Sequence, residues 1–424
     1  MEIKTIQKKN YRLHLIKNTL FKTIAIRINF LAPLKKETIT KRALISSILK
    51  SGTKTCPTKR DLAKKLDYLY GSSIGITLSQ IGASSIMGFN AFYPNPIFLE
   101  DHYLENDIIS LFKEVIFEPN MINGLFNKKA VEMEKRLLKE QIILDNENKN
   151  RYALKRLVEN MYDNDETYLL KNLGIYEEID PMTINELVNY YDRMLDEDVI
   201  DIFVTGDIDF DRYEKLITDN FNFKNRDADD YDILFRENLK IKNQEIIEEK
   251  DINQARLYLG YKTSVRVFSE EYRAFALGNE LLGGYVHSKL FQNVREKNSL
   301  CYYVSSIYDE YKGALIIYSG IDEKEAPKAL KLMKEQVEDI KNGNITEEEL
   351  QLTKDMVISS LYQNMDTLTA PLNRIYTCLL LKKDPDIEQL VEEIKKITVS
   401  DIVKAFQTVN LDTVYLLRGE NNGK

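Results

Sequence analysis

Cysteine is scarce in this chain of 424 residues, which contains only Cys56, Cys301 and Cys378. The three are odd in number and far apart, so they supply neither a disulfide framework nor the spacing of a structural metal site. Such usage fits a reducing compartment. Because free cysteine is among the most buried residue types, we expect each of them to be a small apolar core residue rather than a reactive thiol.

Histidine is equally scarce, and only His14, His102 and His287 occur. A helical zinc site of the common kind needs two imidazoles on one helical face, about three or four residues apart. No two of these histidines lie that close in the sequence, so the chain has no helical histidine pair. A metal site assembled from distant histidines stays open at this point.

Long apolar runs are missing as well. The sequence has no stretch of the about 18 or more apolar residues that a membrane-spanning helix needs, and charges interrupt the apolar runs near the N-terminus, so no signal peptide is expected. Basic residues are not in excess, because 59 Lys and Arg face 67 Asp and Glu, for a net charge of -8. This balance argues against nucleic-acid partners, mildly favours basic peptides, and predicts a cytoplasmic protein without a membrane partner.

The order of hydrophobic patterns predicts α+β domains. In the first half, a strand is followed by helices, a strand pair, long helices, a capped helix and a closing strand. We expect these elements at residues 21–31, 39–49, 61–69, 73–78, 85–92 and 104–160, then from the cap Thr183-x-x-Glu186, and at 198–206. Strands followed by runs of helices favour a mostly antiparallel sheet with helices packed on one face.

The second half repeats this order. Strands are expected at 256–261, 302–308, 314–318 and 412–419, with helices at 271–282, 288–296 and 325–380, a cap at Thr346-x-x-Glu349 within the last of these, and a helix capped by Thr398-x-x-Asp401. The segment TINELVNYYDRM of the first half matches TVSDIVKAFQTV of the second. We interpret this as an internal duplication that produced two similar domains. The predicted domains are residues 1–223 and 241–424, joined by a polar linker at 224–240.

A segment of the second half carries the most specific motifs. Within residues 283–321 these are Gly283-Gly284, Ser288-Lys289-Leu290-Phe291, Arg295-Glu296-Lys297 and Leu300-Cys301-Tyr302. In order and spacing the segment resembles the C-terminal domain of the pitrilysin/insulinase peptidases. The first-half segments RALISSILKSGT and DLAKKLDYLYGSS resemble the metal-site region of the same family. The resemblance covers nearly the whole chain and implies a metallopeptidase-like fold with two domains.

The resemblance also implies where a zinc site would lie. Active members carry H-x-x-E-H, in which two imidazoles bind the ion and the glutamate acts on the zinc-bound water. With the chains aligned on Gly52-Thr53, the positions of the first histidine, the glutamate and the second histidine fall on Ala43, Ser46 and Ser47. These side chains cannot serve as anionic ligands or as a base at neutral pH.

The third zinc ligand of the family is a glutamate on a later helix. Glu132 and Glu134 match a preceding Glu-x-Glu pair, but the ligand position seven residues after Glu134 falls on Gln141. All three ligands and the base are therefore missing. We expect no zinc, no other cofactor and no peptide hydrolysis by this chain alone.

Two functional residues of the family are retained. The resemblance implies that Arg295 holds a carbonyl or carboxylate of the substrate and that Tyr302 donates to the developing oxyanion. Alternatively, Arg295 pairs with a nearby carboxylate and Tyr302 packs in a core. Successive strand residues point to opposite faces, so we expect only one of Tyr302 and Tyr303 to face a substrate chamber, and we predict Tyr302.

These observations leave several functions open. The first is a non-catalytic subunit that closes half of a chamber and lends Arg295 and Tyr302 to a zinc-bearing H-x-x-E-H partner, as in bacterial pairs that include proteins associated with elongation factor P modification. The second is an inert structural or peptide-binding homodimer. A third possibility is an independent enzyme with a mechanism that does not use zinc, but the sequence has no Ser-His-Asp or Cys-His pattern to support it. Extended peptides are the expected ligands, added as a strand along 73–79 if that strand lies at a sheet edge.

Overall fold

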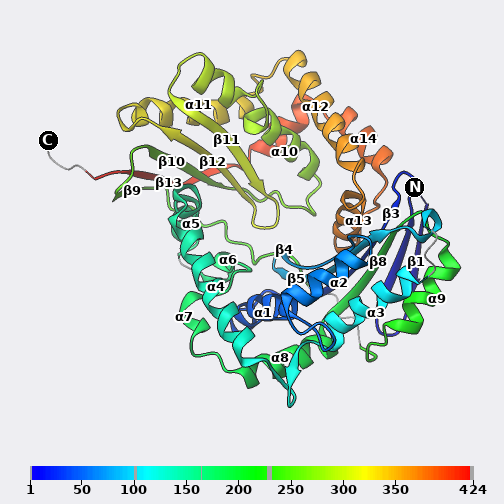
Figure 1. Ribbon diagram of the computed structural model, residues 1–424. Helices are drawn as coiled ribbons and strands as arrows, with labels where there is room; N and C mark the ends of the chain where they lie inside the picture. Colours follow the sequence, from blue (N-terminus) through cyan, green and yellow to red (C-terminus); the bar gives the residue numbers. More distant parts are fainter. Residues whose placement is uncertain (1, 100–102, 164, 227–231, 421–424) are drawn as a thin grey trace. The chain divides into compact units, whose positions relative to one another are not determined.

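The computed structural model describes residues 2–99, 103–163, 165–226 and 232–420. The chain divides into two compact units, each discontinuous in sequence (Figure 1). Unit 1 comprises residues 1–143, 170–233 and 367–377, and unit 2 comprises 144–169, 234–366 and 378–424. The domain division predicted from the sequence stays a prediction, and residues 227–231 of the predicted linker lie outside the described residues.

Unit 1 is built on a six-stranded sheet with the order β1-β2-β8-β3-β5-β4. The strands are β1 Glu2–Gln7, β2 Arg12–Lys17, β3 Thr23–Pro33, β4 Ser73–Ile81, β5 Ser84–Pro94 and β8 Val199–Gly206. All neighbours are antiparallel except β2 and β8, which run parallel. The sheet is therefore mostly antiparallel, as predicted.

The helices of unit 1 cover its sheet. They are α1 Lys36–Ile48, α2 Lys59–Tyr68, α3 Leu104–Phe117, α4 Lys128–Glu147, α7 Tyr176–Ile179, α8 Ile184–Glu197 and α9 Phe210–Asn220, with short turns η1 Leu49–Ser51 and η2 Pro96–Phe98 and a small hairpin of β6 Met121–Ile122 and β7 Leu125–Phe126. Helices α1, α3 and α8 lie on one side of the sheet (Figure 1), and their apolar residues form one core with alternate residues of the strands. Helix α13 Ala370–Leu380 reaches the other side, where Tyr376 packs edge-on against Phe203 of β8. Every residue of β8 is buried as a result.

Unit 2 has a five-stranded sheet with the order β11-β12-β10-β13-β9. Its strands are β9 Gln244–Lys250, β10 Ala255–Lys262, β11 Cys301–Asp309, β12 Ala314–Ile321 and β13 Asn410–Gly419. Its helices and turns are α5 Lys149–Met161, α6 Glu166–Leu169, α10 Tyr272–Asn279, η3 Glu280–Gly284, η4 Phe291–Glu296, η5 Glu323–Glu325, α11 Ala326–Lys341, α12 Glu347–Met365, α14 Ile387–Lys396 and α15 Val399–Phe406. Helices α10, α11 and α15 share a core with the sheet.

The two sheets have the same topology, which confirms the prediction of two similar domains. In chain order, strands β2, β3, β4, β5 and β8 of unit 1 correspond to β9, β10, β11, β12 and β13 of unit 2, because each set is hydrogen-bonded in the same spatial order. Both sets contain one parallel pair, β2 with β8 and β9 with β13. Strands β4 and β11 are thus equivalent edge strands.

Each unit also receives a helix from the other half of the sequence. Helix α5 packs on the sheet of unit 2, where Tyr152 and Arg156 both bond Glu248 of β9. Residues 367–377 in turn belong to unit 1, where Arg27 of β3 donates to Asn373 at 2.5 Å. The sequence patterns located both helices but not their partners.

Local signals were the most reliable. Thr183, Thr346 and Thr398 each form the expected capping box, with the third helical residue donating to the threonine hydroxyl. Among the longer elements, the patterns missed β1, β2, β9, α9 and α14. Strand β9 alternates exposed and half-buried residues but has only two apolar side chains, Ile246 and Ile247, so it lacks an apolar alternation. Helix α9 does have a helical apolar period, through Phe210, Tyr213, Leu216 and Ile217. No helix in the described ranges is long and apolar enough to cross a membrane.

Candidate functional site

The positions aligned with the zinc ligands lie on α1 in unit 1. Ala43 and Ser46 are buried, and the Ser46 hydroxyl donates to the carbonyl of Ala43 at 2.8 Å. Ser47 is half-buried, and its carbonyl accepts from the Ser51 hydroxyl at 3.3 Å. The retained polar groups therefore complete bonds within the end of their own helix.

The third aligned position lies on α4, where Gln141 is exposed. Seven residues earlier, Glu134 is buried, with 5% of its surface exposed. Its carboxylate accepts from Lys59 Nζ at 2.6 Å and from Ser51 Oγ at 3.0 Å. The charge of the buried Glu134 carboxylate is thus neutralised by Lys59, the first residue of α2.

The side chains at these positions do not fit a zinc ion. Alanine offers no ligand, and serine and glutamine offer only neutral oxygens, whereas zinc in proteins is held by imidazole, thiolate or carboxylate. Over the described parts of the chain, no three His, Cys, Asp or Glu side chains gather into a possible metal site. His14 contacts Thr5 and Asp201, His287 contacts Thr353, and His102 lies outside the described residues.

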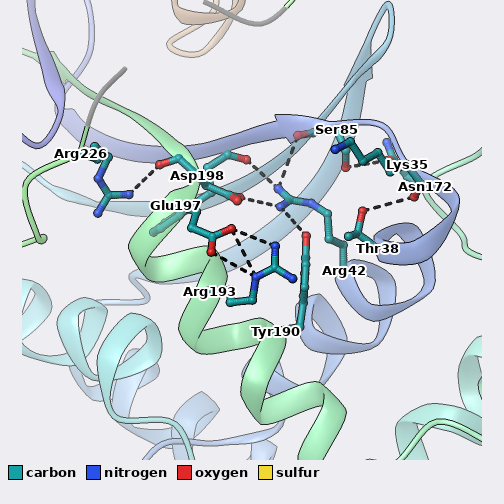
Figure 2. Close-up of polar contacts among 11 residues, drawn as sticks. Lys35, Thr38, Arg42, Ser85, Asn172, Tyr190, Arg193, Glu197, Asp198 and Arg226 are labelled. Carbon is teal, nitrogen blue, oxygen red and sulfur yellow. Dashed lines mark hydrogen bonds and ion pairs between the residues drawn. The ribbon is translucent and has the colours of Figure 1, made fainter. Parts of the chain in front are cut away.

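A buried arginine fixes α1 in place (Figure 2). Arg42, the residue before Ala43, is 1% exposed. It donates to Asp198 Oδ2 at 2.6 Å, just after the end of α8, and to the Tyr190 hydroxyl in the middle of that helix at 3.3 Å. Desolvation lowers the pKa of Arg42, but Asp198 and Tyr190 outweigh it, so its pKa stays above the ordinary arginine value and the group is charged.

The same guanidinium also binds two strands. Arg42 Nη2 donates to the carbonyl of Phe30 on β3 at 2.8 Å and to that of Ser85 on β5 at 3.5 Å. On the other side, Arg226 donates to the carbonyl of Asp198 at 2.6 Å (Figure 2). Helix α1 is therefore tied to α8 and to the sheet without any contribution from a metal.

The strand next to this region lies at the edge of the sheet. Strand β4 is the last in the order and pairs only with β5, so one side of its backbone is free of strand partners. The predicted strand at 73–79 is thus an edge strand, the position that an added peptide strand requires. Peptide binding there stays a prediction.

The retained arginine and tyrosine lie in unit 2. Arg295 is in the last turn of η4, its side chain 41% exposed, 4.0 Å from Glu296 and 4.6 Å from the centroid of the Phe291 ring. Tyr302 is 69% exposed and is therefore not a core residue. It occupies a β-bulge, because Cys301 pairs with Ile321 and Tyr303 with Gly320 while Tyr302 has no opposite residue. Bulges of this kind redirect a side chain away from the ladder.

Tyr303 behaves differently from its neighbour. Its hydroxyl donates to Asn150 Oδ1 at 2.8 Å, and the guanidinium of Arg256 lies 6.0 Å from its ring centroid. The two tyrosines therefore face different surroundings, and the exposed one is Tyr302. Cys301, which directly precedes Tyr302 in the sequence, is buried. Desolvation raises the pKa of its thiol to about 11. Cys56 is buried too, whereas Cys378 is only half-buried.

Sequence patterns did not identify Lys59 or Arg42 as part of this site. Lys59 carried a signal, because it is the first residue of α2, where the helix dipole favours acidic side chains. A cation in that position indicates a specific carboxylate nearby. Arg42 carried none, because its partner lies 156 residues away in the sequence.

The chain is similar to several known proteins. Residues 181–357 match the peptidase M16 inactive domain. The chain is 34% identical over 96% of its length to the probable inactive metalloprotease YmfF of Bacillus subtilis (strain 168) and covers 95% of that protein. It is 28% identical over 38% of its length to the uncharacterized zinc protease YmxG of the same strain, covering 39% of that protein. A conserved protein from Enterococcus faecalis V583 has a crystal structure with a TM-score of 0.92, 30% identity and full coverage of both chains.

The chain belongs to the peptidase M16 family, the pitrilysin/insulinase type that its motifs resemble. Within that family it is an inactive homologue, because it matches the inactive domain of the family and is similar over nearly its whole length to a probable inactive metalloprotease. The assignment of Ala43, Ser46, Ser47 and Gln141 to the zinc-motif positions stays a prediction. The sequence-based predictions of family and fold are therefore confirmed, and the comparisons support a non-catalytic role.

Replacing Arg42 by methionine tests the anchor of α1. The change leaves Asp198 buried without its ion partner, so we expect the free energy of unfolding to fall by about 3–5 kcal/mol. Denaturant unfolding followed by circular dichroism measures it. Arg193→Met is the control, because Arg193 forms an exposed pair with Glu197 one turn along α8 and should cost about 0.5 kcal/mol. Equal losses for both variants would contradict the anchoring role.

Replacing Lys59 by methionine tests the neutralisation of Glu134. The carboxylate would keep its hydrogen bond from Ser51 but lose its ion pair, and we expect a loss of about 1–3 kcal/mol in the free energy of unfolding. Adding Glu134→Gln removes the buried charge and should restore part of that loss. The control is Lys64→Met, an exposed site on the same helix. A double variant less stable than the sum of its single changes would argue against the pairing.

Proposed function

We propose that this chain is the non-catalytic subunit of a heterodimeric zinc peptidase, forming half of a closed chamber and contributing Arg295 and Tyr302 to a partner that bears H-x-x-E-H. The observation that carries the proposal is the exposed bulge position of Tyr302, in the same unit as the half-exposed Arg295. An exposed tyrosine redirected by a bulge is available to a ligand, whereas the vacated metal positions of α1 offer no chemistry of their own.

The proposed roles follow from the side chains. A guanidinium offers forked donors that can hold a substrate carbonyl or carboxylate. The phenol hydroxyl of Tyr302 can donate a hydrogen bond to the oxyanion that forms when water attacks the peptide carbonyl. Neither group activates water, so the partner must supply the ion and the base. The chain's own contribution is binding and charge stabilisation.

A zinc-bearing homologue is the proposed partner. Bacillus subtilis contains both a probable inactive metalloprotease and an uncharacterized zinc protease that resemble this chain, which supports a division of labour between two related proteins. We place the complex in the cytoplasm, with extended peptides bound along β4. The duplicated halves 1–223 and 241–424 would then be the evolutionary domains of the subunit.

Reconstitution tests this function. The purified chain is mixed with a homologue that carries H-x-x-E-H, and cleavage of unstructured fluorogenic peptides is followed. We expect cleavage by the mixture only, and a fall of about 10²–10³ in kcat for Tyr302→Phe, as for the loss of an oxyanion donor. Arg295→Ala should raise KM as well, because it removes substrate binding.

The neighbouring tyrosine supplies a matched control. Tyr303→Phe removes the same atom from the next residue, which bonds Asn150 instead of facing outward, so the rate should stay unchanged. Gel filtration of each mixture verifies that the complex forms. If Tyr302→Phe and Arg295→Ala leave the rate intact, the contribution in trans is wrong and a structural or peptide-binding homodimer becomes the better account.

Metal content gives an independent prediction. We expect the pure chain, dialysed against micromolar zinc and then buffer, to retain well under one equivalent by mass spectrometry, because its aligned positions lack anionic or imidazole ligands. The zinc-bearing partner treated in parallel is the positive control. Stoichiometric zinc in this chain, lost on Ser47→Ala or Gln141→Ala, would overturn the assignment.

A further inference from the structure

Lys50 follows the helix that carries the predicted zinc-motif positions, and it contacts the edge strand β4. Lys50 belongs to η1, the turn that continues α1, and its ammonium group donates to the carbonyl of Ile76 on β4 at 3.5 Å. This is a long hydrogen bond, and its acceptor belongs to the strand whose far side has no strand partner. The cation is therefore held at the edge by one weak contact.

The charges around Lys50 do not balance. Lys50 and Lys59 are two cations, and Glu134 is the carboxylate near both. Glu134 is engaged by Lys59 at 2.6 Å, while Lys50 forms no ion pair with a carboxylate of the described residues. Desolvation lowers the pKa of Lys50, with Glu134 opposing and Lys59 reinforcing the shift. Lys50 is exposed, and a cation without a paired anion gains from a ligand that brings one.

We propose that Lys50 binds a carboxylate of a peptide that lies along β4, so that the vacated metal region selects peptides by a negative group. The inference rests on the proposed function, because it assumes that extended peptides bind this edge. Backbone bonds to the strand give affinity without sequence preference, and the ammonium group adds a preference for one charge at one point. The net charge of -8 alone would favour basic peptides. A cation in contact with the ligand has a larger effect than distant surface charges, because salt screens the distant ones.

Two kinds of peptide carboxylate could pair with Lys50. A free C-terminal α-carboxylate and the side chain of Asp or Glu present the same group, and each can pair with an ammonium ion. The α-carboxylate occurs once in each peptide and lies at its end. A cleaved peptide has one at the new end, so binding of this kind retains products or positions the end of a substrate.

Binding of labelled peptides to the full chain tests the inference. The probes are one unstructured, uncharged ten-residue peptide with a fluorescent label at its N-terminus, prepared with a free C-terminus, with an amidated C-terminus, and amidated with a glutamate as last residue. Fluorescence anisotropy at low salt gives each Kd. We expect the free acid to bind about tenfold more tightly than the amide, the gain expected for a charge-assisted bond. The glutamate probe distinguishes an α-carboxylate from a side-chain carboxylate.

Variants assign the preference to one residue. Lys50→Met should make acid and amide bind alike, whereas Lys50→Arg should keep the preference. Lys64→Met on α2 removes an equal charge from an exposed position and should leave the preference unchanged. Thermal unfolding verifies that each variant is folded.

The outcomes separate this inference from the proposed function. Equal binding of acid and amide by the unchanged chain overturns the inference and leaves peptide binding intact. A preference lost equally in Lys64→Met also overturns it, because the cause would be net charge. If Lys50→Met only promotes self-association, Lys50 protects the edge strand and the inference is wrong. If no peptide binds in any form, peptide binding along β4 fails as well, while the cleavage assay with Tyr302→Phe still decides the role in trans.

Discussion

The buried pair of Arg42 and Asp198 is the constraint on which unit 1 depends. A guanidinium that is withdrawn from water needs acceptors, and those of the Arg42 terminal nitrogens come from Asp198, from Tyr190 and from two strands (Figure 2), while its Nε has no partner among the described residues. These bonds join helix α1 to α8 and to the sheet. A buried ion pair adds little net stability compared with apolar packing, but it penalises every other arrangement. The pair therefore holds in place the helix that carries Ala43, Ser46 and Ser47, the positions predicted to match the zinc motif.

The shared topology allows equivalent positions of the two units to be compared. Strands β4 and β11 are equivalent edge strands, yet their surroundings differ. Beside β4, the positions aligned with the zinc motif have become small or neutral, and a lysine contacts the strand. At the start of β11, a bulge leaves Tyr302 exposed. One edge strand is thus contacted by a lysine, and the other begins with an exposed hydroxyl donor.

Sequence reasoning succeeded where the determining contacts are local. The three capping boxes follow from residues three apart, and the strands from alternation over a few positions. It failed where partners are distant. Helix α5 bonds Glu248 about ninety residues later, and residues 367–377 join a sheet formed in the first half, contacts that no local pattern signals. The absence of zinc ligands was visible at once because only three histidines occur, whereas the lysine that answers Glu134 required the fold.

The charges near the predicted zinc-motif positions also differ from those of a zinc site. Glu134 is buried and needs a positive neighbour, and Lys59 now meets that need from the start of α2. Introducing Ala43→His, Ser46→Glu and Ser47→His would restore the ligand spacing, but Ala43 is buried in the core beneath the sheet and Gln141 remains neutral. A divalent ion at the aligned positions would find no anionic ligand among their side chains. Lys59 pairs instead with Glu134, and an ammonium group can pair with an anion but cannot activate water.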